Sequence, residues 1–126
     1  MSLVPDDLRY TKEHEWLKPA ADGTALVGIT DYAQESLGDI VFVELCKVGK
    51  SFVGGAVFGV VESVKAASDL FMPVAAEVVE INPLLETQPE LVNKDPYKAG
   101  WMLKVRLSDP AAASGLLDAA AYRKLV

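Results

Sequence analysis

Residues 56–81 read AVFGVVESVKAASDLFMPVAAEVVEI, which is two apolar, β-rich runs on either side of one lysine, Lys65. Glu62, Lys65 and Asp69 interrupt the apolar residues, so neither run can span a membrane, and each has the length and composition of a buried strand. A charged side chain between two buried strands must reach water, so we expect Lys65 at the tip of a hairpin. Positions 64–66 hold no Asn-Gly or Asp-Gly pair, which favours a type I turn over a primed turn.

Short strand candidates separated by turn residues fill much of the remaining chain. Further strands are expected at 14–18, 23–29, 40–45 and 101–107. Many short strands followed by late helices predict one antiparallel β domain over residues 1–126, of sandwich or flattened-barrel type.

Helices are expected in three places. Thr30 or Asp31 can cap a short helix that Gly38 closes in the left-handed conformation. A helical turn is expected near 84–92, because this stretch is otherwise long for a loop. The C-terminal segment 110–125 begins with proline and is rich in Ala and Leu, which predicts one or two short helices.

The composition restricts the possible partners and functions. The chain has 126 residues, of which 12 are basic and 18 acidic, and its net charge is −6. It contains no basic cluster, which argues against binding to nucleic acid or to an anionic membrane surface. Cys46 is the only cysteine, so no intramolecular disulfide can form, and a buried structural thiol is expected. His14 is the only histidine, which argues against a zinc or similar metal site.

The sequence carries no signature of catalysis or of export. It has no nucleophile elbow, P-loop or dinucleotide fingerprint, so we do not expect the chain to be an enzyme by itself. Residues 1–20 hold no apolar core of signal-peptide type, so the protein is not expected to be secreted. A bacterial cytoplasm and a mitochondrial matrix both remain open.

The residues around Lys65 resemble the lipoyl-lysine site of the glycine cleavage system H protein family. The motifs that carry this resemblance are Glu62-Ser63-Val64-Lys65-Ala66, Ser68-Asp69-Leu70 and Pro73-Val74. Segments before and after them resemble other parts of the family in the same order, from about Leu8 onward: Tyr10-Thr11-Lys12-Glu13-His14-Glu15-Trp16, Gly28-Ile29-Thr30-Asp31-Tyr32-Ala33-Gln34, Leu37–Leu45, Leu91-Val92-Asn93, Pro96-Tyr97 and Gly100-Trp101-Met102.

The resemblance implies a fold, a cofactor and partners. The fold is the lipoyl/biotinyl-carrier β-sandwich with added helices, and the cofactor is lipoate, attached as an amide to Lys65. The implied function is to shuttle the aminomethyl group of glycine and reducing equivalents. The implied partners are glycine decarboxylase, the aminomethyltransferase, dihydrolipoyl dehydrogenase and a lipoate-attaching enzyme. A monomer is expected.

The resemblance also assigns roles to three acidic residues. The family's amine-contacting acids correspond here to Glu15 and Asp69, while Glu62 and Asp69 flank the lysine and are expected to serve its modification or the loaded arm. Without the resemblance, Glu15 and Asp69 are a pair of ordinary surface carboxylates. Glu13 stands where the family often has a serine, which leaves its role open.

Two further departures from the family pattern concern the chain after the lysine. Ala75-Ala76 replaces Ser-Gly, and a positive φ at Ala76 would cost about 1 kcal/mol. Phe71-Met72 replaces a more polar pair, which would leave apolar surface near the arm.

Several alternatives compete with this interpretation. A protein of the same family acting mainly as a lipoyl donor to other proteins would use the same lysine. A biotinyl lysine usually lies between two methionines, whereas Val64 and Ala66 flank Lys65. Lipoyl domains of 2-oxoacid dehydrogenase acyltransferases resemble only the middle of the chain and are followed by flexible linkers, which are absent here.

Overall fold

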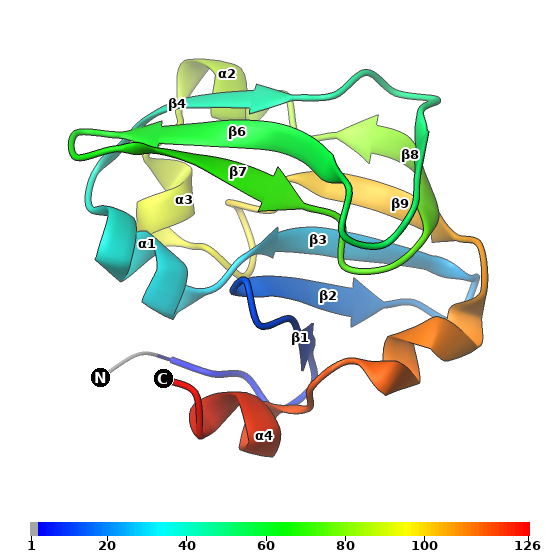
Figure 1. Ribbon diagram of the computed structural model, residues 1–126. Helices are drawn as coiled ribbons and strands as arrows, with labels where there is room; N and C mark the ends of the chain where they lie inside the picture. The colour runs from blue at the N-terminus through cyan, green and yellow to red at the C-terminus, as the bar shows by residue number, and fades with distance from the viewer. Residues whose placement is uncertain (1–2) are drawn as a thin grey trace.

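The computed structural model describes residues 3–126 and shows two antiparallel β-sheets packed against each other (Figure 1). The larger sheet has six strands in the order β1-β2-β3-β9-β8-β5, and the smaller has three in the order β4-β6-β7. The strands are β1 Arg9–Tyr10, β2 Glu15–Pro19, β3 Thr24–Ile29, β4 Ile40–Leu45, β5 Ser51–Phe52, β6 Val57–Ser63, β7 Ala67–Phe71, β8 Ala76–Ile81 and β9 Leu103–Leu107. Over the described residues neither sheet closes on itself, so the expected β-sandwich is confirmed in an open form and not as a barrel.

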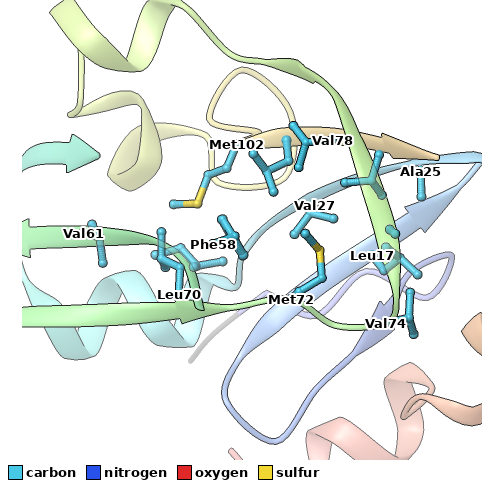
Figure 2. Close-up of a cluster of buried hydrophobic side chains, with 14 of the residues drawn as sticks. Leu17, Ala25, Val27, Phe58, Val61, Leu70, Met72, Val74, Val78 and Met102 are labelled. Carbon is cyan, nitrogen blue, oxygen red and sulfur yellow. The ribbon is translucent and has the colours of Figure 1, made fainter. Parts of the chain in front are cut away.

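Side chains from both sheets meet in one apolar layer between them (Figure 2). Leu17 and Val27 of the larger sheet are fully buried there, and Phe58, Val61 and Leu70 contribute from the smaller sheet. Each such side chain stabilises the fold by about 1.5–3 kcal/mol relative to an exposed position. The two sheets are therefore held together mainly by this layer.

A second, aromatic cluster lies on the other side of the larger sheet's first strands. Trp16, Tyr10 and Tyr122 are completely buried in it, and the rings of Tyr10 and Tyr122 stack at 4.6 Å between centroids. The indole Nε1 of Trp16 donates to the carbonyl of Pro96 at 3.0 Å. This cluster attaches the C-terminal segment to the sandwich.

The second apolar run of the sequence is divided between the two sheets. Its first half forms β7 in the smaller sheet, and its second half forms β8 in the larger one. Pro73 lies in the connection, where a residue without an N–H ends the ladder. The prediction of two continuous buried strands was therefore wrong in this respect. The prediction also overestimated how many side chains are buried, because only Phe58 and Val61 of β6 and Leu70 of β7 are buried.

The expected helices are present, and Thr30 caps the first of them. The helices are α1 Asp31–Leu37, α2 Leu84–Thr87, α3 Leu91–Lys94, the 3₁₀ helix η1 Pro110–Gly115 and α4 Ala119–Arg123. The Thr30 hydroxyl accepts from the N–H of Ala33 at 3.2 Å, and the N–H of Gly38 donates to the carbonyl of Gln34. Gly38 has φ 80° and ψ −160°, so the positive φ was predicted correctly but the backbone is not in the left-handed helical region.

Two smaller expectations are corrected by the backbone. Strand β9 begins at Leu103 and not at residue 101. Among the described residues, His14 is the only non-glycine with positive φ, so Ala76 has an ordinary strand conformation and carries no such strain. Within residues 3–126, no helix has the length and apolar character needed to cross a membrane.

Candidate functional site

Lys65 lies in the connection between β6 and β7, at the end of the hairpin seen at the left of Figure 1. The N–H of Ser63 donates to the carbonyl of Ala66 at 2.8 Å, which leaves Val64 and Lys65 as the two residues of the turn. Neither of them has a positive φ, so the turn is not of the primed type, as expected. The side chain of Lys65 is exposed.

Ser63 holds this turn together with its side chain. Its Oγ accepts from the N–H groups of Lys65 and Ala66, both at 3.1 Å, in the manner of a serine turn. Ser63 belongs to the sequence motif around Lys65, but no role for its side chain was predicted from the sequence. A serine two residues before a turn residue was the signal that could have found this bond.

A second contact supports the hairpin tip from outside the hairpin. The N–H of Val64 donates to the carbonyl of Asp39 at 3.0 Å. The aliphatic stem of Lys65 passes over Gly38, where an added Cβ would lie 3.4 Å from Cε of the lysine. The root of the lysine is thus fixed against the segment between α1 and β4, while its amine faces solvent.

The two acids that flank the lysine in sequence are exposed on the strands of the hairpin. Glu62 of β6 pairs with Ala67, and Asp69 of β7 pairs with Val60. In the described part of the chain, neither carboxylate forms an ion pair with Lys65. Their charges are therefore available to solvent or to another molecule.

Glu15 differs from these two acids because its carboxyl group is buried, with 2% of the residue exposed. Its Oε1 accepts from the hydroxyl of Thr11 at 2.6 Å, and its Oε2 accepts from the N–H of Phe71 at 3.4 Å. Burial raises the pKa of Glu15 to about 7, although both hydrogen bonds favour the ionised form. A carboxyl group with this pKa changes between its protonated and ionised forms close to neutral pH.

Glu15 lines a cavity of about 440 Å³ between the N-terminal loop, the end of β7 and the C-terminal segment. The lining residues are Tyr10, Thr11, Lys12, Glu13, Glu15, Gly55, Phe71, Met72, Pro73, Gly115, Leu116 and Leu117. Asp69 is not among them, although it stands on the strand that contributes Phe71. The cavity therefore combines an apolar wall with the two acids Glu13 and Glu15.

His14 connects residues 11–14, the turn that leads into β2 and Glu15, to the C-terminal helix. It has φ 70°, and its Nδ1 lies 2.7 Å from the hydroxyl of Tyr122, which is also 2.7 Å from Oγ1 of Thr30. Burial lowers the pKa of His14, so the ring is neutral near pH 7. In residues 3–126, no group of three His, Cys, Asp or Glu side chains is placed to hold a metal ion.

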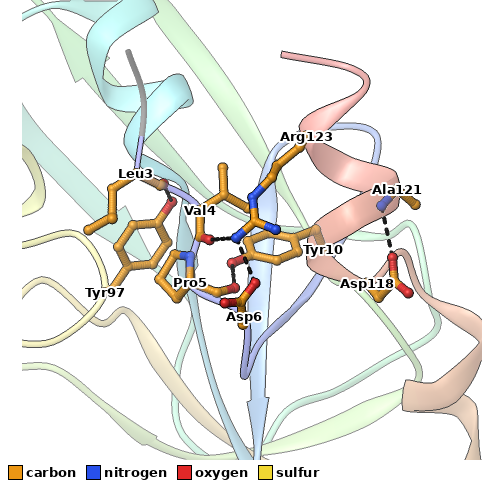
Figure 3. Close-up of polar contacts among 9 residues, drawn as sticks. All are labelled: Leu3, Val4, Pro5, Asp6, Tyr10, Tyr97, Asp118, Ala121 and Arg123. Atoms are coloured by element: carbon orange, nitrogen blue, oxygen red, sulfur yellow. Dashed lines mark hydrogen bonds and ion pairs between the residues drawn. The ribbon is translucent and has the colours of Figure 1, made fainter.

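The two ends of the described chain are joined beside this cavity. The backbones of Tyr10 and Leu117 exchange hydrogen bonds of 2.8 and 2.9 Å. Arg123 of α4 donates to the carbonyl of Val4 and to the carboxylate of Asp6 (Figure 3). The wall formed by Leu116 and Leu117 is therefore tied to β1, directly before the turn that leads into Glu15.

Comparison with known proteins identifies the family. The family model described as Glycine cleavage H-protein matches residues 8–126. The chain belongs to this family. It is 60% identical to the glycine cleavage system H protein of Opitutus terrae, over 100% of this chain and 99% of the relative. It is 55% identical to that of Marinobacter nauticus, over 100% and 97%.

A solved structure agrees with this assignment. The chain is similar to the crystal structure of a glycine cleavage system H protein from Mycobacterium marinum, with a TM-score of 0.87 and 40% sequence identity. The similarity covers 96% of this chain and 97% of the other. The predicted family and carrier-type β-sandwich are thereby confirmed for this member of the H-protein family.

The four residues proposed from the sequence occupy two separate places in this family member. Lys65, Glu62 and Asp69 belong to the hairpin, whereas Glu15 lies in the cavity. Glu15 and Asp69, which the resemblance gives as contacts of the cargo amine, do not contact each other in the described chain. Thr11 is the cavity residue that sequence reasoning missed, since a hydroxyl four residues before an acid gives no sign of a bond until the loop is folded.

Proposed function

We propose that lipoate is attached to Nζ of Lys65 and that the chain is the lipoylated carrier protein of the glycine cleavage system. One observation supports the attachment site above all. Lys65 is an exposed lysine at a hairpin tip that both the Ser63 side chain and the Asp39 carbonyl hold in place. The carrier role follows from the family to which residues 8–126 belong.

The residues of the hairpin and of the cavity fit such a group. An amide on Lys65 needs an amine in solvent and a firmly held root, and the hairpin supplies both. A lipoyl group bound there would supply the dithiol that carries the aminomethyl group and the reducing equivalents. Cys46 is the only cysteine, so the chain has no second thiol with which to do this itself.

Glu15 is proposed to receive the positive charge of the cargo. An ammonium group that enters the cavity meets a carboxylate already oriented by Thr11, away from bulk water. The incoming cation favours the ionised acid, so Glu15 releases its proton to solvent as the ammonium binds. Asp69 is proposed as a second, exposed carboxylate on the path between hairpin and cavity.

Glu62 is proposed to serve recognition by the enzyme that attaches lipoate. It is exposed on the same hairpin and makes no contact with Lys65 that would give it a structural role in the described chain. Exposed charges of this kind usually change folding stability by no more than about 0.5 kcal/mol.

The remaining partners are proposed from the family. They are glycine decarboxylase, the aminomethyltransferase and dihydrolipoyl dehydrogenase, among which the chain moves as a monomer without catalysing a reaction of its own. The relatives from Opitutus terrae and Marinobacter nauticus are bacterial proteins, which favours the bacterial cytoplasm over a mitochondrial matrix.

The attachment site is tested by intact mass and peptide mapping after incubation with a purified lipoate–protein ligase, lipoate and ATP. We expect a mass increment of one lipoyl amide, located on Lys65. Lys65→Arg should keep the fold and gain no mass, because a guanidinium is not acylated in the same way. Lys47→Arg, another exposed lysine, is the control and should be modified like the wild type. Lipoate on another lysine, or in Lys65→Arg, would contradict the assignment.

A further inference from the structure

The side-chain amide of Asn93, in α3, forms hydrogen bonds with α1 and with the short segment that follows it. Its Oδ1 accepts from the N–H of Ile40 at 2.8 Å. Its Nδ2 donates to the carbonyl of Gly38 at 2.9 Å and to Oε1 of Gln34 at 2.8 Å. Residues 38–40, here called the 38–40 bend, are thus held from both ends by one side chain.

The 38–40 bend is the surface on which the lysine hairpin rests. The carbonyl of Asp39 accepts from the N–H of Val64, and Gly38 provides the space over which the stem of Lys65 passes. Both of these contacts reach the hairpin tip from outside the hairpin, and both come from this bend.

The strand pairing alone does not fix the bend. The register between β4 and β6 shifts by one residue immediately after Ile40, so that Ile40 pairs with Ser63 but Phe42 pairs with Glu62. At such a bulge the ladder is locally interrupted and the strand bends. The bond from Ile40 to Asn93 satisfies a backbone N–H at this irregular position.

We propose that Asn93 is a positioning residue for the modification of Lys65. It does not touch the lysine; it fixes the 38–40 bend, and the bend fixes the root of the lysine. This inference rests on the proposed lipoylation of Lys65 and adds a residue that neither the lysine motif nor the cavity includes.

The chain offers a matched control in Asn82. Its Nδ2 donates to the carbonyls of Ala99 and Trp101 at 2.9 and 2.8 Å, and its Oδ1 accepts from the N–H of Leu84 at 3.1 Å. Asn82 therefore also donates two bonds and accepts one from a backbone N–H, as Asn93 does, but none of its bonds reaches the bend or the hairpin. Asn93→Asp and Asn82→Asp each keep the acceptor and lose two donated bonds.

Two readouts separate positioning from a general loss of stability. The first is amide hydrogen exchange of Val64, which we expect to accelerate at least about tenfold in Asn93→Asp and to stay unchanged in Asn82→Asp. The second is kcat/KM of a lipoate–protein ligase for the unmodified chain, which we expect to fall about tenfold in Asn93→Asp and less than about twofold in Asn82→Asp.

The outcomes decide between the explanations. Equal effects of the two substitutions, or wild-type exchange at Val64 in Asn93→Asp, would overturn the inference. A wild-type chain that accepts no lipoate on Lys65 would instead overturn the proposed function, while the exchange data would still decide whether Asn93 holds the hairpin tip.

The unaltered chain provides a further test if Asn93→Asp does not fold. The amides of Lys65 and Ala66 bond only to Ser63 within the turn, whereas that of Val64 bonds to the bend. We expect Val64 to exchange more slowly than both. Equal exchange of the three amides would show that the bend does not hold the tip, and would overturn the inference.

Discussion

At the scale of single residues, burial controls the chemistry of Glu15. Its desolvated carboxyl group has a pKa raised to about 7, whereas a carboxyl group in the unfolded chain has its ordinary value near 4.5. At a pH between these two pKa values, Glu15 holds a proton in the folded chain that it has released in the unfolded chain. The associated stability is present at low pH and is lost as the pH rises through about 7.

We therefore expect the free energy of unfolding of the wild type to fall by about 2–3 kcal/mol more than that of Glu15→Gln between about pH 5 and pH 8. Urea titrations of both proteins at the two pH values measure this difference. His14, whose pKa burial lowers, is present in both proteins and largely cancels in the comparison. The same pH dependence in both would mean that Glu15 is already ionised in the folded chain.

The carboxylate of Glu15 should also protect the cargo. A charge-assisted hydrogen bond of about 1.5–3 kcal/mol is lost in Glu15→Gln, so the loaded protein should release formaldehyde about ten- to a hundredfold faster without partner enzymes. Asp69→Asn should have a smaller effect, because Asp69 is exposed. Glu13→Gln, at an exposed acid that also lines the cavity, is the control. If Glu15→Gln retains the cargo as long as the wild type, protection comes from other residues.

The sequence could predict Lys65 better than Glu15, and the reason is physical. A charge between two apolar runs must reach solvent wherever the strands lie, so the exposure of Lys65 follows from local pattern. Glu15 is buried in the folded chain and accepts from the N–H of Phe71, which is distant in the sequence and is brought to it by tertiary packing. The resemblance alone selected Glu15, and neither Thr11 nor the raised pKa could be read from it.

At the scale of elements, the hydrophobic pattern of the sequence failed to predict how the second apolar run divides between the two sheets. Apolar residues predominate on both sides of Pro73, so nothing but the proline indicated that β7 and β8 join different sheets. The burial of β6 and β7 was overestimated for a related reason. A single sequence does not say whether a second layer covers the outer face of a sheet, and only Phe58, Val61 and Leu70 of these strands face the core.

The C-terminal helix gives a prediction at this scale. Tyr122→Phe removes the hydroxyl that bonds both His14 and Thr30, and should cost about 1–3 kcal/mol of unfolding free energy. Tyr32 is half-buried beside the same histidine, and Tyr32→Phe should change the unfolding free energy by less than about 0.5 kcal/mol. Urea unfolding of the two variants makes the comparison. A loss no larger for Tyr122→Phe than for Tyr32→Phe would mean that the hydroxyl does not hold α4 to the turn before Glu15.

At the scale of the whole molecule, the order of the motifs predicted the fold class, but not how the strands pair. Short strands with turn signals gave an antiparallel β protein, and the resemblance from Leu8 onward gave the carrier-type sandwich. The attachment of the C-terminal segment through the Tyr10–Leu117 bridge and the Tyr10–Tyr122 stack could not be foreseen. Both contacts join opposite ends of the chain, and no local pattern encodes such a pairing.

The central claim is that the chain carries glycine-derived groups on Lys65 between separate enzymes. Its most direct test is NADH formation from glycine, tetrahydrofolate and NAD⁺ in a mixture of glycine decarboxylase, aminomethyltransferase and dihydrolipoyl dehydrogenase. The lipoylated wild-type chain should start the reaction at a rate that rises with its concentration, and Lys65→Arg treated with the same ligase should give only the background rate. Equal rates with the two proteins, or no reaction with the lipoylated wild type, would contradict the account.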